Sequence, residues 1–215
     1  MNSAVRTRAI RTRHSARQAR AKILTHFRRE SILAAARTVF AKHGFATTTV
    51  DLIAEEAGVA KGTVYLYYSS KTALYSEAVV AGMRELAHQT VVSLSADIPL
   101  QDKLRNLLEM RMRYFEERAD FFRIYNAELG SLGQAAVQIR QEYRRSLNVQ
   151  VERLEKELRA AIRKRTVRKH NSRQVALAVL DLSHGIVQRR LDNDARDRRE
   201  DIDELLNVLW RGIAT

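Results

Sequence analysis

Residues that break helices are scarce in this chain, because its 215 residues include eight glycines and one proline. Between them, apolar side chains recur three and four positions apart, the spacing that places them on one face of an α-helix. No segment alternates between apolar and polar residues for long enough to predict a sheet, and no repeat of helical-solenoid length occurs. The sequence therefore predicts an all-α protein.

Composition narrows the class of protein further. Hydrophobic residues make up 45% of the chain, enough for one or two cores, and cysteine is absent. The lack of cysteine excludes a disulfide framework and a thiol nucleophile, and it favours a reducing compartment. No apolar run approaches the roughly 18 residues that span a bilayer. We therefore expect a soluble, cytoplasmic protein without a membrane partner.

Basic residues outnumber acidic ones, 38 to 25, and the formal net charge of +13 predicts a polyanionic partner. Nine of the basic residues precede the first acid, Glu30. Residues 1–27 hold few large apolar side chains, so we expect a flexible basic arm that lies along nucleic-acid phosphates. A solvated tail and a mitochondrial transit peptide are alternative interpretations, and the helical remainder of the chain argues against the second.

Glycines and capping residues divide the next region into short helices. A helix that begins near Arg28 should end at Gly44, because glycine adopts the backbone conformation that closes a helix. Helices over 50–57 and 61–67 should flank a turn at 58–60. Two short helices joined by such a turn have the dimensions of a helix-turn-helix.

A longer helix over residues 71–93 should connect this region to the rest of the chain. Serine, aspartate and proline cluster at 93–99, where we place the boundary between a helix-turn-helix domain, residues 28–75, and a helical domain, residues 94–215. The helices predicted beyond this boundary cover residues 100–118, 120–129, 134–165, 171–191 and 199–213.

Many positions between Ile32 and Tyr75 carry the residues of a known pattern in order and at the right spacing. They are Phe40, Gly44-Phe45, Thr48-Thr49-Val50, Ile53-Ala54, Ala57-Gly58-Val59, Gly62-Thr63-Val64-Tyr65, Tyr67-Tyr68, Ser70-Lys71 and Leu74. This stretch closely resembles the N-terminal DNA-binding domain of the tetracycline-repressor-like (TetR/AcrR) family of bacterial transcriptional regulators. The resemblance covers 44 of the 215 residues, and the remainder resembles the family only in helicity and length.

The resemblance implies an N-terminal three-helix DNA-binding domain and a C-terminal helical domain that binds an effector and dimerises. Two copies on a two-fold axis would read successive major grooves of a palindromic operator, with half-sites about 34 Å apart or a near multiple of that. It further implies a cytoplasmic repressor, associated with the nucleoid when bound, that a small apolar or amphipathic ligand releases.

The chemistry of the same residues fits DNA contact. Thr48 and Thr49 offer hydroxyl and amide groups at a helix N-terminus, a seat for one phosphate. Lys61 begins the second short helix, where a cation costs about 0.3–1 kcal/mol against the helix dipole, so we expect DNA to compensate it. Tyr68 stands where the family usually has phenylalanine, and its hydroxyl is expected to reach water or a partner.

The second short helix should read the base edges. Gly62 and Thr63 are small enough to let the helix approach them. By resemblance, Tyr65 and Tyr67 contact phosphates, and Lys71 supplies a point charge that acts on all DNA sequences alike. Packing within a three-helix domain is the alternative role for these tyrosines.

Methionines and aromatics at helical spacing in the C-terminal domain are typical of a plain core. The resemblance implies that some of them wall a cavity for an effector. Arg111 lies on the same stripe, so it either extends to solvent or meets an acid, within the chain or on a ligand, and we favour a structural role for it and for His184. The candidate ligand-binding residues are Met110, Arg111, Tyr114, Phe121, Phe122, Tyr125, Tyr143 and His184.

The helix predicted over 171–191 is apolar nearly all round, and the last predicted helix carries a second apolar stripe. The resemblance implies that these two helices form a four-helix dimer interface, and an internal core is the alternative. The candidate interface residues are Val179, Leu182, Gly185, Ile186, Leu205, Leu209 and Trp210.

The chain lacks the motifs of the common enzyme classes. The segment Gly130-Ser131-Leu132-Gly133 has the wrong spacing for a nucleophile elbow, and the six histidines show no metal-ligand spacing. We expect no catalytic residue, metal or cofactor, and as partners a duplex operator, a second copy of the chain and an unknown effector. An architectural or other nucleic-acid-binding protein without effector control is the alternative function.

Overall fold

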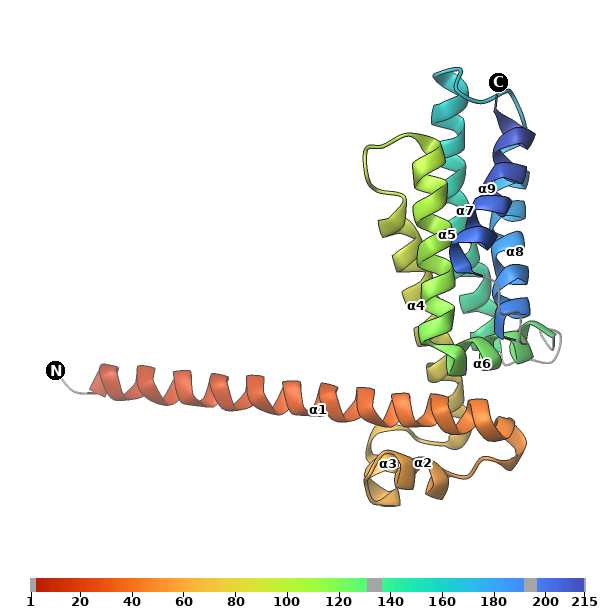
Figure 1. The fold of residues 1–215 in the computed structure, drawn as a ribbon. Helices are drawn as coiled ribbons and strands as arrows, with labels where there is room; N and C mark the ends of the chain where they lie inside the picture. Colours follow the sequence, from red (N-terminus) through yellow and green to blue (C-terminus); the bar gives the residue numbers. More distant parts are fainter. Residues whose placement is uncertain (1–2, 131–136, 192–196, 215) are drawn as a thin grey trace. The chain divides into compact units, whose positions relative to one another are not determined.

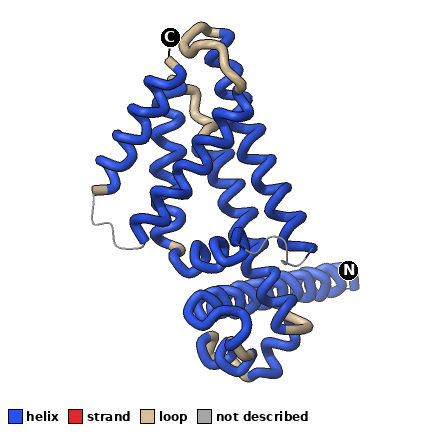
Figure 2. Tube along the Cα trace, turned by 90° about the vertical axis from the view of Figure 1, so that its right-hand side faces the viewer, coloured by secondary structure: helices blue, strands red, loops and turns tan. Residues whose placement is uncertain are grey.

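The computed structural model describes residues 3–130, 137–191 and 197–214, and every regular element within these ranges is a helix (Figures 1 and 2). The helices are α1 (Ser3–Thr47), α2 (Val50–Glu56), α3 (Lys61–Tyr67), α4 (Lys71–Ser93), α5 (Leu100–Glu117), α6 (Ala119–Gly130), α7 (Val137–Arg163), α8 (Ser172–Leu191) and α9 (Arg198–Ile213). Among the described helices, none combines the length and the apolar character that a membrane-spanning segment requires.

The chain forms two compact units, Met1–Ala78 and Val79–Thr215, so the division falls inside α4 rather than at 93–99. The gaps between the predicted helices at 130–133 and 192–198, and the predicted helix start at 134, lie wholly or partly outside the described residues.

Helix α1 begins 25 residues earlier than predicted, because it continues through the basic arm to Ser3. The arm holds no proline or glycine, so nothing in its sequence ends the helix, and arginine and alanine are good helix formers. Residues 20–30 are all exposed, in keeping with a segment that has little apolar surface to bury. Gly44 interrupts the helix with φ +74°, a conformation that few other residues adopt.

The first unit is built around the buried face of α1. The side chain of Phe40 packs edge-on against Tyr75, with ring centroids 4.9 Å apart, and Phe45 lies beside both rings. Apolar residues of the two short helices, α2 and α3, are buried with it. The core residues of this unit include Ile32, Leu33, Ala36, Val39, Phe40, Val50, Ile53, Ala54, Val64 and Leu74.

Helix α5 is central to the second unit, where it contacts α6, α7, α8 and α9. Gly82 of α4 lies directly against the Phe121 ring, so a larger residue there would clash. The aromatic rings of Phe115, Phe121 and Phe122 are buried together. A short antiparallel bridge joins Val167 to Ala214.

Candidate functional site

The turn between α2 and α3 is closed by backbone hydrogen bonds. Gly58 has φ +63°, and the amides of Gly58 and Val59 donate to the carbonyls of Glu55 and Ala54, at 3.0 and 2.9 Å. A left-handed residue with two such bonds ends α2 and redirects the chain into α3, whose Val64 is buried. The structure thus has the predicted helix-turn-helix.

The two threonines before α2 have different roles. Thr49 is the N-cap, and its hydroxyl accepts a hydrogen bond from the amide of Leu52 at 3.3 Å. Thr48 is buried, and its hydroxyl donates to the carbonyl of Gly44 at 2.7 Å. The prediction that the Thr48 hydroxyl faces a phosphate is therefore wrong, because that hydroxyl closes the end of α1 instead.

Lys61 has a partner within the protein. Its Nζ lies 2.8 Å from Oδ2 of Asp51 in the first turn of α2, and both side chains are exposed. The hydrogen bond from Lys61 to Asp51 and the charge of that carboxylate raise the pKa of the lysine. The expectation that only DNA would compensate Lys61 is therefore incorrect, although its ammonium remains accessible.

The outward face of α3 consists of residues that do not contribute to packing within the protein. A Cβ atom on Gly62 would meet nothing within 4 Å, so packing within the protein does not require glycine there. Tyr65 and Leu66 follow on the same face, with 48% and 83% of their surface exposed. Leu66 was missed by the sequence reasoning, and its signal is a large apolar residue out of phase with the buried Val64.

Lys71 is tied to the end of α1. Its Nζ donates to the carbonyls of Phe45, Ala46 and Thr48 at 2.8, 3.3 and 2.9 Å, and lies 4.5 Å from the centre of the Phe45 ring. Three carbonyls and a ring account for the donors of this ammonium. The role predicted for Lys71, a free point charge for phosphate, is thus replaced by a structural one.

The remaining predicted DNA contacts lie at the border of the core. Thr63 and Tyr67 are half-buried, so each presents only part of its side chain. Tyr68 is buried, its hydroxyl donates to the carbonyl of Arg29 at 3.2 Å, and burial raises its pKa to about 12. The expectation that the Tyr68 hydroxyl reaches water or a partner is therefore wrong.

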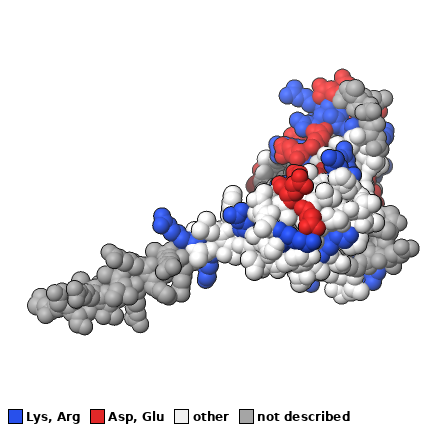
Figure 3. Space-filling model, turned by 90° about the horizontal axis from the view of Figure 1, so that it is seen from below, with Lys and Arg blue, Asp and Glu red and all other residues white. Residues whose placement is uncertain are grey.

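Basic side chains stand on the described part of α1 (Figure 3). Arg20, Lys22, Arg28 and Arg29 are exposed, and Arg29 lies 3.6 Å from Glu77. Exposed cations along one helix create the positive potential that attracts a polyanion.

A cavity of about 200 Å³ in the second unit brings together four of the predicted ligand-binding residues, Arg111, Tyr125, Tyr143 and His184. The other four are buried in the core around it: Met110, Tyr114, whose hydroxyl donates to Gly82, Phe121 and Phe122.

Arg111 neither extends to solvent nor meets an acid among the described residues. Its Nε and Nη1 donate to Ser183 Oγ and Gln150 Oε1, each at 2.7 Å, and burial lowers its pKa. Burial and the nearby Arg111 charge lower the pKa of His184 to about 4. His184 is therefore neutral at pH 7.

The α8–α9 face carries a groove of about 490 Å³ lined by Leu182, Gly185, Ile186, Leu205 and Val208, among others. Leu182 is 46% exposed and Val208 63%, so apolar surface is open to solvent there. Two other predicted interface residues, Val179 and Leu209, are buried within the unit.

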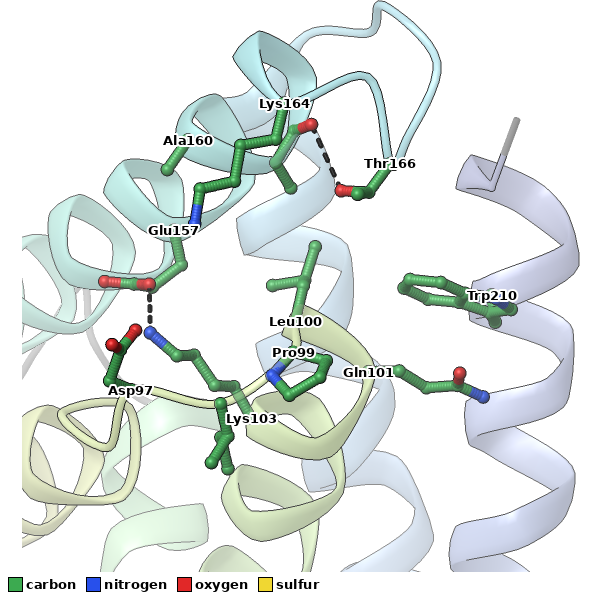
Figure 4. A pocket seen from close by; sticks show the side chains of 12 residues that line it. Asp97, Pro99, Leu100, Gln101, Lys103, Glu157, Ala160, Lys164, Thr166 and Trp210 are labelled. Atoms are coloured by element: carbon green, nitrogen blue, oxygen red, sulfur yellow. Dashed lines mark hydrogen bonds and ion pairs between the residues drawn. The ribbon is translucent and has the colours of Figure 1, made fainter.

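Trp210, the last predicted interface residue, lines a different pocket of about 490 Å³ (Figure 4). That pocket lies between the start of α5, the end of α7 and α9. On its wall, Lys103 Nζ lies 2.5 Å from Glu157 Oε2. Burial alone would raise the pKa of Glu157, but the hydrogen bonds from Lys103 and Arg153 outweigh it and lower the pKa. Trp210 thus belongs to a separate surface from Leu182.

Residues 32–78 match the family described as bacterial regulatory proteins, tetR family. The uncharacterized HTH-type transcriptional regulator YhgD of Bacillus subtilis is 27% identical over 56% of this chain and 63% of its own length. The probable acrEF/envCD operon repressor of Escherichia coli K12 is 31% identical over 40% of each chain. This chain therefore spans less than two thirds of either curated relative.

A solved structure extends the similarity to both units. FadR of Bacillus subtilis, a transcriptional regulator in complex with stearoyl-CoA, has a TM-score of 0.71 over 84% of this chain and 96% of its own, at 21% identity. At that identity the likeness concerns the fold alone. The family match covers the helix-turn-helix built by α2 and α3, so this part of the chain is similar to the tetR family of bacterial regulatory proteins.

Proposed function

We propose that the chain is a transcriptional regulator that binds a palindromic DNA operator as a homodimer. The observation that carries this proposal is the outward face of α3, where Gly62, Tyr65 and Leu66 are exposed without a packing role in the protein. Backbone at Gly62 can approach base edges, the Leu66 side chain can contact a thymine methyl group, and Tyr65 can donate to a phosphate. Thr49, Lys61, Thr63 and Tyr67 complete this surface.

The groove on the α8–α9 face is the proposed dimer contact. Leu182 and Val208 are exposed there, and the open space at Gly185 allows a second helix to approach closely. Two copies related by a two-fold axis would present two α3 helices to one duplex. Half-sites should then lie about 34 Å apart or a near multiple of that.

We propose that the protein acts in the cytoplasm as a repressor and that a small ligand controls it. The similarity to the acrEF/envCD repressor supports repression, and the stearoyl-CoA complex of FadR supports control by a bound ligand. Helix α4 begins beside α3 and continues into the second unit, so it links the two functions along the chain. Such a ligand changes DNA affinity only by its differential binding to the DNA-competent and DNA-incompetent states.

Selection of bound sequences from random duplex DNA tests the proposal. We expect an inverted repeat, bound by a dimer, and loss of that preference when Tyr65 and Leu66 are replaced by alanine. Recovery of unrelated sequences, or binding that scrambled competitor DNA removes equally well, would reject a regulator of specific genes. The second candidate, an architectural DNA-binding protein, predicts that result, because such proteins protect DNA with little base discrimination.

A further inference from the structure

Arg111 is a buried cation without a buried counter-charge. It is 4% exposed, and no acid among the described residues lies within ion-pair distance of it. Burying a charge is costly unless it is paired and hydrogen-bonded, so arginines in protein interiors normally lie beside carboxylates. Arg111 therefore lacks the partner that its position demands.

The two groups that accept from Arg111 do not depend on it. Ser183 Oγ also donates to the carbonyl of Leu180 at 2.7 Å. Gln150 Oε1 also accepts from Thr90, and its Nε2 donates to the carbonyl of Ser146. Both side chains would remain hydrogen-bonded without the guanidinium, so the packing of α7 and α8 does not explain an arginine at this position.

The Arg111 guanidinium lines the cavity of about 200 Å³, and some of its N–H groups have no acceptor among the described residues. No described residue accepts from its Nη2, and no described residue shares a hydrogen bond with the hydroxyl of Tyr125 or Tyr143. The rings of Tyr125 and His184 lie 5.6 Å apart on the same wall. The cavity thus joins one fixed cation and free hydroxyls to aromatic walls.

Asp181 is the one acid that lines this cavity, and its side chain is exposed. No ion pair joins it to Arg111 among the described residues, and its exposed carboxylate is open to solvent. That carboxylate repels a second negative charge on a ligand, so we expect the ligand to carry one anionic group, which binds at Arg111.

We propose that the effector of this regulator is a small monoanion, a carboxylate with an aromatic or short apolar body, whose charged group pairs with Arg111. The Nη2 group, which has no acceptor among the described residues, can donate a charge-assisted hydrogen bond to a carboxylate, and the ring faces suit an apolar body. The volume is below the about 300–1,000 Å³ of pockets for drug-sized ligands, so the body must be small. This inference rests on the proposed effector control and adds the chemistry of the ligand.

Calorimetric titration of the full chain with carboxylates and their neutral amides tests the pairing. The probes are benzoate, 3-phenylpropanoate and hexanoate, each beside its primary amide. We expect at least one acid to bind, with its amide about tenfold to a hundredfold weaker. Binding of no acid, or equal binding of each acid and its amide, would overturn the proposal.

Two variants separate recognition from folding. Arg111→Met should abolish the preference for the acid and raise the melting temperature of the ligand-free protein, because it removes an unpaired buried charge. A fall in melting temperature with unchanged acid binding would assign Arg111 a structural role and overturn the proposal. Asp181→Asn should tighten binding of the acid, and weaker binding would contradict the placement of the anion.

Operator binding is measured separately on the same samples. Acid binding at Arg111 without a change in DNA affinity would uphold the anion site and reject effector control. Release of DNA by acid and amide alike would uphold effector control and reject the anion site.

Discussion

Lys61 Nζ and Asp51 Oδ2 lie 2.8 Å apart, and this exposed pair joins the start of α3 to the first turn of α2. Asp51 neutralises Lys61, the cation at the start of α3. The carboxylate of Asp51 therefore weakens the attraction of α3 to DNA phosphates. We predict that Asp51→Asn strengthens operator binding several-fold at low salt and leaves the melting temperature nearly unchanged. Gel-shift titration and thermal unfolding measure the two effects.

Glu56→Gln is the matched control, because Glu56 is an exposed acid at the other end of α2. It changes the net charge by the same amount without releasing Lys61. An equal gain from both variants would mean that Lys61 has no individual role.

Lys71 should contribute to the stability of the fold more than to DNA binding. Lys71→Met keeps the alkyl chain over Phe45 but removes the ammonium that three carbonyls accept. We predict a loss of about 1–3 kcal/mol in the free energy of unfolding, measured in urea. Lys61→Met is the control and should leave the unfolding midpoint unchanged; an equal shift in both variants would contradict the structural role of Lys71.

Local sequence signals were sufficient to place the helix-turn-helix. Gly58, the Thr49 cap and the spacing of Ile53 and Val64 predicted both short helices nearly to the residue, because these signals act within one turn of helix. The orientations of the Thr48 hydroxyl and the Lys71 ammonium were not predictable in this way. Their acceptors are carbonyls at the end of α1, which tertiary packing brings to them.

Gly62→Ala should separate DNA binding from folding. A methyl group there meets nothing within the protein, and alanine favours a helix by up to about 1 kcal/mol over glycine. We predict an unchanged or higher melting temperature and about tenfold weaker operator binding, because the methyl group keeps the helix from the base edges. Undiminished binding would show that the backbone at Gly62 does not approach the DNA closely.

Gly185→Ala is the reciprocal control in α8, since a methyl group there also meets nothing within the chain. It should leave the helix at least as stable but weaken the dimer, measured by sedimentation at a range of concentrations. A dimer of unchanged affinity would move the interface away from Gly185.

Stability should fall in mild acid because of His184. Its folded pKa of about 4 lies below the ordinary 6.5, so the unfolded chain takes up a proton first as the pH falls. The protein should therefore lose about 1–3 kcal/mol between pH 6.5 and pH 4, and His184→Gln should lose less over that window. His43→Gln, at an exposed position of α1, should follow the wild-type curve. Identical curves for all three proteins would exclude His184 as the cause.

The C-terminal unit was predictable as helices and apolar faces, but not as a site. The sequence placed Arg111 on an apolar stripe and left open where its side chain ends, because Ser183 and Gln150 come from helices whose packing no local pattern encodes. For the basic arm, the sequence predicted the degree of burial but not the local structure. The arm's lack of apolar surface predicted the exposure of residues 20–27 correctly, but the helix in α1 follows from residue propensity alone.

Deletion of residues 2–19 tests whether the basic arm contacts DNA. This segment carries five arginines, at positions 6, 8, 11, 13 and 17. Each arginine that neutralises a phosphate adds about −0.9 to the slope of log affinity against log salt, so the deletion of five should flatten that slope by up to about 4.5. A second variant with the five arginines replaced by glutamine keeps the length of α1 and should give the same result. An unchanged slope of log affinity against log salt in both variants would show that the arm does not lie on the phosphates. The charge that attracts DNA would then reside in the helix-turn-helix and the rest of α1.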